Sequence, residues 1–202
     1  MSEPSLPDKI VAIDRALQDA DVPHAFGGAI ALAYYAEPRA TVDVDVNVFI
    51  GPDHVDAVSA ALSPLGIAPP PSSDGEASDG EASDGEASDR ARVRRNGQAR
   101  WWWGRTPIDL FFAYDPVHDA MRAAVRSVPF GNDRIPVLGP EHLVVCKVVF
   151  DRDKDWLDIV QVLTAVPDFD SAEVRRWLDH LLRADDPRRR HFDEIAIQML
   201  GH

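Results

Sequence analysis

The sequence of 202 residues predicts an α+β fold, in which a mixed β-sheet is flanked by helices and followed by a carboxy-terminal helical region. Valine alternates with polar residues over 42–48, which is the period of a strand with one buried face. Residues 107–114 form a second, strongly apolar strand. Beyond residue 138 the apolar positions recur at helical spacing. We therefore expect a core over residues 1–138 and a helical region over residues 139–202.

The first half of the chain is expected to alternate helices with strands. Ile10, Ile13 and Leu17 recur at helical spacing, and Pro38 would end a small-residue helix that follows the glycine pair 27–28. The elements expected in order are a helix over 7–20, a strand over 22–26, a helix over 28–36, a strand over 43–50 and a helix over 52–62.

The second half is expected to contain one more central strand, a small edge hairpin and five helices. Asp170 and Asp186 are good caps for the last two helices. The elements expected in order are a strand over 107–114, a helix over 117–125, a hairpin of 127–130 with 135–138, and helices over 140–150, 154–165, 171–182 and 187–200.

Residues 69–90 interrupt this pattern with three prolines and a repeated Glu-Ala-Ser-Asp-Gly unit. The repeat has no residue that could build a core, so we expect a disordered acidic loop. Removing its seven acidic residues would take the formal net charge from −13 to −6. The loop either lies over the basic segment that follows and competes with a polyanion, or is a solubilising low-complexity expansion.

Residues 90–105 contain six arginines and no acidic residue. The Asn96-Gly97 pair between two short runs is typical of a β-hairpin turn. Alternation would place Trp101 and Trp103 on one face and Trp102 on the other. Arginines beside stacking surfaces suit a single-stranded RNA or a tRNA end, whereas the alternative is a solvated edge that discourages strand pairing. The candidate nucleic-acid contacts are Arg92, Arg94, Arg95 and Arg100.

Composition excludes several classes of protein. The net charge of −13 argues against a surface that attracts nucleic acid everywhere. No apolar run could span a bilayer, and the first residues do not resemble a signal peptide, so we expect a cytoplasmic protein without a membrane partner. Cys146 is the single cysteine, which excludes an intramolecular disulfide, and we expect a buried, inert thiol.

Three carboxylates form the candidate site. Asp43 and Asp45 share one strand face, and Asp109 lies on the later strand. If the two strands are neighbours, these side chains converge into an oxygen-rich site for Mg²⁺ or Mn²⁺. Gly27 and Gly28 would let a phosphate approach the backbone closely. The alternatives are a turn-capping Asp109 and a glycine pair that only makes a tight turn.

These residues resemble the nucleotidyltransferase superfamily with the DNA-polymerase-β-like core. Its pattern of a glycine turn, a helix, an Asp-x-Asp strand and a later strand Asp is met by Gly27-Gly28, Asp43-Val44-Asp45 and Asp109. The segment 38–43 looks like the lead-in of the branch that contains abortive-infection and toxin nucleotidyltransferases. The resemblance covers residues 23 to about 163, and the acidic repeat is foreign to it.

The resemblance implies a nucleotidyltransferase-like sheet and an enzyme that moves a nucleoside monophosphate from an NTP to an acceptor hydroxyl. Asp43 and Asp45 would bind the metal, and Asp109 would be a third ligand or the base for the acceptor. Gly27 and Gly28 would hold the triphosphate.

The helical region would complete the active site. By the same resemblance, Lys147 would hold nucleotide phosphates, and Asp155 or Asp158 would complete the site. From the residues alone, Lys147 could equally extend from an apolar helix without a ligand. Arg39 would contact phosphate or pair with an acid such as Glu37, and we expect His24 to be structural rather than catalytic.

The family branch also implies partners. The acceptor would be a tRNA 3′ end or a protein side chain, and the protein would be the toxin half of a toxin–antitoxin pair with a cognate antitoxin. One alternative is an antibiotic-type nucleotidyltransferase that modifies a small molecule. Another is a catalytically silent module that binds a nucleotide or a protein partner.

Overall fold

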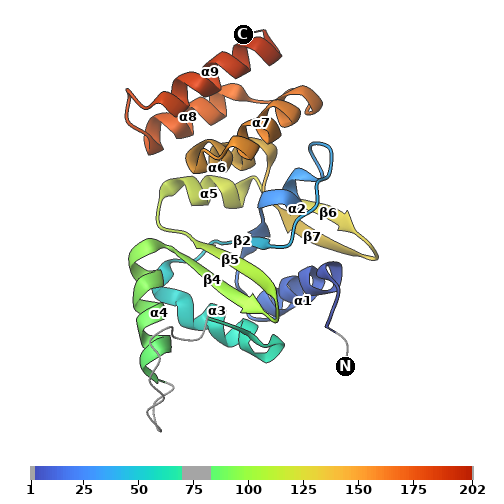
Figure 1. Cartoon of the computed structure of the whole chain (residues 1–202), viewed down its shortest axis with the longest axis vertical. Helices are drawn as coiled ribbons and strands as arrows, with labels where there is room; N and C mark the ends of the chain where they lie inside the picture. Colours follow the sequence, from blue (N-terminus) through green and yellow to red (C-terminus); the bar gives the residue numbers. More distant parts are fainter. Residues whose placement is uncertain (1–2, 70–82, 202) are drawn as a thin grey trace.

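The computed structural model describes residues 3–69 and 83–201, and these form a mixed α/β fold (Figure 1). The seven strands of the described residues make one sheet in the order β3-β4-β5-β2-β1-β7-β6. Their bounds are β1 (His24–Phe26), β2 (Val44–Val48), β3 (Ile67–Ala68), β4 (Gln98–Trp103), β5 (Thr106–Phe112), β6 (Arg126–Phe130) and β7 (Asp133–Val137).

Helices cover both faces of this sheet. In Figure 1, α1, α3 and α4 lie below it, α5 and α6 lie above it, and α7, α8 and α9 stack on α6. The bounds are α1 (Leu6–Asp19), α2 (Gly28–Leu32), α3 (Val55–Leu62), α4 (Ser83–Asn96), α5 (Pro116–Ala123), α6 (Pro140–Phe150), α7 (Asp153–Ala165), α8 (Ser171–Leu181) and α9 (Pro187–Leu200), with short 3₁₀ turns at Pro52–His54 and Ser63–Leu65. The carboxy-terminal helical region is therefore confirmed.

The central strands β2 and β5 run parallel, and Asp45 lies opposite Asp109. Val44, Val46 and Val48 are fully buried on the other face of β2, which packs toward α1 and α3. The alternation in the sequence thus separates an apolar face from a carboxylate face, as expected. Val42 is an exception, because β2 begins at Val44 and the Val42 side chain is 77% exposed.

The predicted hairpin around Asn96-Gly97 is wrong. Residues up to Asn96 belong to helix α4, and Gly97 ends that helix with φ +67°, its amide donating to Val93 O at 2.8 Å. A glycine with positive φ serves a helix end as readily as a hairpin turn, so the dipeptide did not distinguish them. The hairpin instead joins β4 to β5 around Gly104.

The predicted disordered loop over 69–90 is also wrong at its end, since residues 83–90 are helical. Residues 70–82 lie outside the described residues. Two features explain the helix: Val93 on it is fully buried, and Arg90 and Arg94, one turn apart, both pair with Asp56. Tertiary burial decided this segment, which composition alone assigned to coil.

Smaller differences concern the ends of elements. Helix α2 stops at Leu32 rather than Ala36, and the chain continues in turns. The predicted hairpin of β6 and β7 is present at the edge of the sheet. Among the described residues, no helix is long and apolar enough to cross a membrane.

Candidate active site

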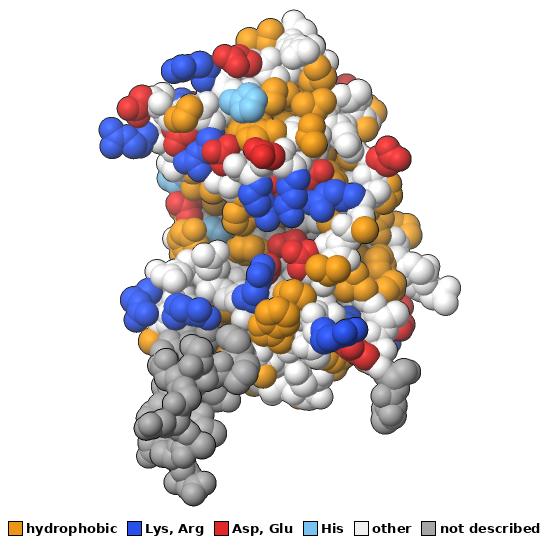
Figure 2. All heavy atoms as spheres, in the orientation of Figure 1, with side chains coloured by type: hydrophobic (Ala, Val, Ile, Leu, Met, Phe, Trp, Pro, Cys, Tyr) orange, Lys and Arg blue, Asp and Glu red, His pale blue; other side chains and the backbone are white. Residues whose placement is uncertain are grey.

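Asp43 and Asp45 lie at the start of β2, and Asp109 lies beside Asp45 on β5. The two strands are therefore neighbours, which is the condition that the candidate site required. The carboxylates lie on the sheet face that α6 covers, since Asp45 and Lys147 line the same pocket. Figure 2 shows acidic side chains at the centre of this face with basic side chains on both sides of them.

The pKa values of Asp43, just before β2, and Asp45, within β2, are shifted in opposite directions. Burial, followed by the charges of Asp43 and Asp109, raises the pKa of Asp45 to about 6. Burial also works against ionisation of Asp43, but the Thr41 hydroxyl and the charges of Lys154 and Arg100 outweigh it and lower its pKa. The charges of Arg152 and Lys147 lower the pKa of Asp45, but they do not outweigh burial and the two neighbouring carboxylates.

Asp109 is held by an arginine. The Arg100 guanidinium on β4 donates from Nε and from a terminal nitrogen to the two carboxylate oxygens, at 2.7 Å each. The Asp109 side chain is 13% exposed, whereas Arg100 is 57% exposed. Arg100, a candidate nucleic-acid contact, therefore also positions the third carboxylate of the site.

Gly28 is required beside Asp45. Its φ is +49°, a conformation that L residues adopt rarely, and a Cβ at this position would overlap the Asp45 carboxylate. Gly27 approaches from the same turn, with its amide donating to Asp45 O at 2.9 Å. The glycine pair therefore brings the start of α2 into direct contact with the central carboxylate.

Lys147 on α6 is buried against two carboxylates from α7. Its Nζ lies 2.6 Å from Asp158 and 3.4 Å from Asp155, and its side chain is only 3% exposed. Both acids therefore engage Lys147, although the sequence left open which one mattered. Lys147 also lines the pocket beside Asp45.

Two arginines complete this ionic cluster. Arg39 donates to both oxygens of Asp158 at 3.2–3.3 Å, so it pairs with this acid rather than with the neighbouring Glu37. Arg152 donates to Asp155 at 2.6 and 3.1 Å, and its side chain remains half exposed. The cluster ties the loop before β2 to helices α6 and α7.

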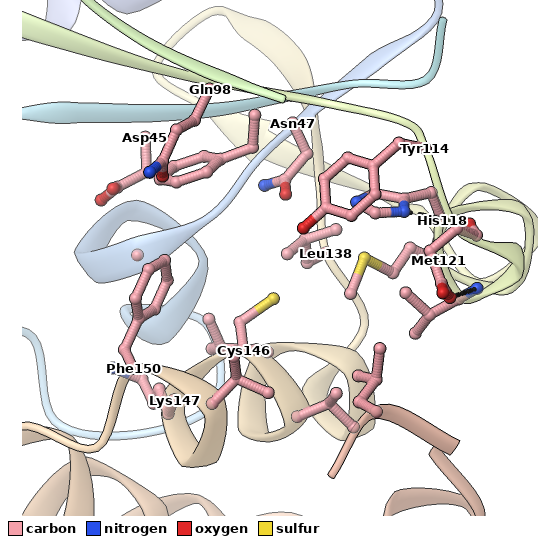
Figure 3. A pocket seen from close by; sticks show the side chains of 18 of the residues that line it. Asp45, Asn47, Gln98, Tyr114, His118, Met121, Leu138, Cys146, Lys147 and Phe150 are labelled. Atoms are coloured by element: carbon pink, nitrogen blue, oxygen red, sulfur yellow. Dashed lines mark hydrogen bonds between the residues drawn. The ribbon is translucent and has the colours of Figure 1, made fainter. Parts of the chain in front are cut away.

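Two cavities meet at Asp45. One is largely apolar and lies between the sheet, α5 and α6 (Figure 3); we call it the apolar pocket. The other is a basic cleft that contains Asp109 and is lined by Arg92, Arg100 and Arg152. The central carboxylate thus separates an apolar compartment from a cationic one.

The remaining candidate arginines lie on the outer side of α4. Arg94 bonds Asp56 at 3.1 Å, and Arg95 is exposed. Trp101 is buried and Trp102 is 37% exposed, as the alternation in the sequence predicted.

The described residues contain no group of three or more His, Cys, Asp or Glu side chains arranged to hold a metal ion. Asp43 bonds Thr41 and Asp109 bonds Arg100, so each faces its own partner. The donor set nevertheless fits a divalent cation, because carboxylate oxygens in register on adjacent strands are the ligands such ions prefer. Metal binding by these residues stays a proposal.

Sequence reasoning missed two residues of this region. Asn47 follows Asp45 on the same face of β2 and lines the apolar pocket, and continuing the alternation by one step would have found it. Arg152 lines both cavities and was not among the candidate site residues, although the segment that it begins, Arg152-Asp153-Lys154-Asp155, resembles a charged segment of the family.

Two other expectations concern structural residues. His24 is buried, with its ring nitrogens 3.0 Å from Asp14 and 2.9 Å from Val22 O, away from the carboxylate site. Cys146 lines the apolar pocket, and burial raises the pKa of its thiol to about 12. Cys146 is partly exposed, so the expected full burial is not found, while the raised pKa fits the expected unreactive thiol.

Comparison with known proteins identifies the family. The family described as "Nucleotidyl transferase AbiEii toxin, Type IV TA system" matches residues 12–201. The chain belongs to this family. As an AbiEii-family member it is a nucleotidyltransferase, and the resemblance inferred from the glycine turn and three aspartates is confirmed. No curated protein matches the chain.

Solved structures show that the AbiEii-family chain shares its fold with other nucleotidyltransferases. An antigenic nucleotidyltransferase-like protein from Paracoccidioides brasiliensis is 13% identical, with a TM-score of 0.56 over 100% of this chain and 99% of that one. ANT(2″)-Ia in complex with adenylyl-2″-tobramycin is also 13% identical, with a TM-score of 0.50 over 93% of this chain and 97% of that one.

Proposed function

We propose that this AbiEii-family enzyme transfers a nucleoside monophosphate from an NTP to a hydroxyl at the end of a nucleic acid, with a tRNA 3′ end as the leading candidate. The observation that carries this proposal is the position of Asp45, between a cationic cleft that contains Asp109 and a pocket that Gly28 borders. The protein would act in the cytoplasm as the toxin of a type IV pair, restrained by a cognate antitoxin.

The basic cleft supports an anionic acceptor. Arg92, Arg100 and Arg152 supply three cationic side chains, and Arg100 already neutralises Asp109. A phosphodiester backbone would be attracted here, whereas an aminoglycoside is a polycation and would be repelled. The small-molecule alternative is therefore less well supported, although ANT(2″)-Ia shares the fold.

Asp43 and Asp45 would hold Mg²⁺ or Mn²⁺, which supplies charge neutralisation for the triphosphate and the leaving pyrophosphate. The fit rests on Asp45, which is buried beside two other carboxylates and whose pKa is raised although Arg152 and Lys147 act to lower it, so a divalent cation would stabilise its charge. Because Gly28 has no side chain, the Asp45 carboxylate lies against the backbone at the start of α2, and a phosphate bound to the metal would be held close to that backbone.

We propose Asp109 as the general base. The acceptor hydroxyl would give its proton to Asp109 while its oxygen attacks the α-phosphorus, and the bond to pyrophosphate would break. Arg100 occupies both Asp109 oxygens, so an acceptor phosphate that pairs with Arg100 would release the carboxylate for this role. Arg152, half exposed between the two cavities, is positioned to contact the triphosphate.

Transfer is tested by incubating the protein with each labelled NTP, total tRNA and Mg²⁺. We expect label on the RNA. Asp43→Asn or Asp45→Asn should lower the rate more than about 100-fold, because metal-assisted stabilisation is worth several kcal/mol. Failure of every NTP to label RNA, with Asp43→Asn indistinguishable from the parent, would contradict the enzyme assignment.

The nucleic-acid acceptor has a separate test in RNA binding. Arg92→Gln should weaken binding and reduce the dependence of log K on log salt by about one. Arg183→Gln is the matched control, since its side chain is 88% exposed at the end of α8 and lies outside the cleft. Equal effects of the two substitutions would argue against an RNA site in the cleft.

A further inference from the structure

The apolar pocket extends from Asp45 along the sheet to α5, and its polar groups are few (Figure 3). Figure 3 shows the Met121 and Cys146 sulfur atoms and the Leu138 side chain directed toward the same space. The far end is closed where Asp115, which lines the pocket, pairs with His180 of α8 at 3.1 Å. The shape is a recess beside the reaction centre with one polar end.

Asn47 is one of the polar side chains that line the apolar pocket. The residue is 6% exposed, yet its carboxamide points into the pocket (Figure 3). Among the described residues, none makes a hydrogen bond with this side chain. The Asn47 amide atoms remain accessible from the pocket, since the fully buried side-chain nitrogen or oxygen atoms without a partner among the described residues are those of His142. An amide that faces the pocket without a protein partner can donate and accept hydrogen bonds, so Asn47 is suited to bind a ligand there.

The chemistry of the walls restricts that ligand. A triphosphate requires cations along its length, but Lys147 and Arg152 lie only at the Asp45 end, and Lys147 is already paired with two acids. A flat heteroaromatic ring suits the rest of the recess, because its faces can pack on Leu138, Met121 and Cys146 while its edge meets an amide. Asn carboxamides pair with the edges of nucleobases through one donor and one acceptor.

We propose that the apolar pocket binds the nucleobase of the NTP and that Asn47 selects among the four bases. This inference rests on the proposed nucleotidyl transfer, since it names the subsite for the donor's base. Gln98, whose amide lies beside Asp45 in Figure 3, stands at the mouth of the pocket, where a ribose would join base to phosphate. Asn47 is thus a specificity-determining residue, separate from the carboxylates that carry out the transfer.

The test is equilibrium binding by calorimetry with ATP, GTP, CTP and UTP in EDTA, and with tripolyphosphate as a probe that lacks a base. We expect the parent to prefer one base. Asn47→Leu, which has nearly the same shape, should weaken binding of that NTP about tenfold and bring the four affinities close together, as expected for lost hydrogen bonds. Tripolyphosphate should bind both proteins equally. Asn132→Leu, an exposed asparagine in the β6–β7 turn, is the matched control.

Three results would overturn the inference. They are equal binding of all four NTPs by the parent, an unchanged base preference in Asn47→Leu, and a loss of tripolyphosphate binding as large as the loss of NTP binding. Because these measurements need no transfer, they are independent of the labelled-NTP assay. If transfer fails while base discrimination depends on Asn47, the proposed reaction is wrong and the nucleobase pocket stands.

Discussion

Asp43 and Asp45 are only two residues apart, yet their pKa values are shifted in opposite directions. Burial and two neighbouring carboxylates oppose ionisation of Asp45, while Thr41 and nearby cations favour ionisation of Asp43. A carboxylate with a raised pKa lowers the stability of the folded protein when it is ionised. Such residues are typical of functional positions, where a reactive or ligand-binding group is retained at a cost in stability.

This difference predicts stability changes of opposite sign. The pKa of Asp45 is raised from 3.8 to about 6, so the folded state keeps its proton longer than the unfolded state, and stability falls as pH rises from about 4 to about 6. Asp45→Asn should therefore raise the free energy of unfolding at pH 7.5 by on the order of 2 kcal/mol, and this gain should vanish below about pH 4.

Asp43→Asn is the matched control, because its lowered pKa means that its charge stabilises the fold. We expect Asp43→Asn to be less stable than the parent at pH 7.5. Urea unfolding of the three proteins in EDTA at pH 4 and pH 7.5 measures both effects. If Asp45→Asn is less stable than the parent at pH 7.5, the ionised Asp45 carboxylate stabilises the folded state and the prediction is wrong.

At the scale of elements, an ionic clamp joins α6 and α7. Lys147 lies within 3.4 Å of both Asp155 and Asp158, and each acid also receives an arginine. Helix α6 packs on α2 and forms one wall of the apolar pocket. The ionic clamp therefore fixes α7 to the helix that covers this pocket. Asp155 and Asp158 position other groups in this arrangement, and Lys147 is the member that borders the pocket.

Removing one charged member of the clamp should lower the free energy of unfolding more than removing two oppositely charged members together. Asp158→Asn leaves Lys147 buried with less compensating charge, so we expect unfolding to become easier by about 3–5 kcal/mol. Adding Lys147→Met should restore part of this loss, since Asp155 keeps Arg152 and Arg39 is one-third exposed. Denaturant unfolding of the single and double variants measures the coupling, and strictly additive losses would refute the clamp.

At the scale of the whole molecule, the charge is distributed unevenly. The chain carries a net charge of −13, while the cleft beside Asp109 is lined by three arginines. The acidic repeat ends within α4, and α4 also carries Arg92 of that cleft. A polyanionic substrate would therefore meet a local attraction within a repulsive overall field.

Neutralising the repeat should strengthen RNA binding. We consider a variant in which Asp74, Glu76, Asp79 and Glu81 are replaced by their amides, which takes the net charge from −13 to −9. Its affinity for RNA should rise at about 50 mM salt and match the parent at about 500 mM, because screening removes the effect.

The control makes the same change of charge on the exposed surface of α8 and α9, where ion pairs contribute little to stability. Its substituted residues are Asp179, Asp185, Asp193 and Glu194. If both variants gain equally, net charge alone explains the result. If neither gains, the acidic repeat is a solubilising expansion without an effect on the cleft.

The sequence by itself determined the periodic parts of this protein. These parts are the strand alternation around Asp45, the carboxy-terminal helices, and the order of glycine turn and aspartates. Each is a local pattern that follows from the period of a strand or helix and from the residues that begin and end helices. These were sufficient to predict the fold class and the family, whereas the pairing of the two aspartate strands was a condition that only the structure could establish.

Only the tertiary structure decided which partner each side chain has. Arg100 meets Asp109 across a strand pair, Asp158 meets Arg39 over more than one hundred residues, and α4 is a helix because Val93 is buried. Asn47 acquires its significance only because α5 and α6 enclose the space that it faces. Such contacts arise from the burial of distant segments against one another, which no local pattern in the chain encodes.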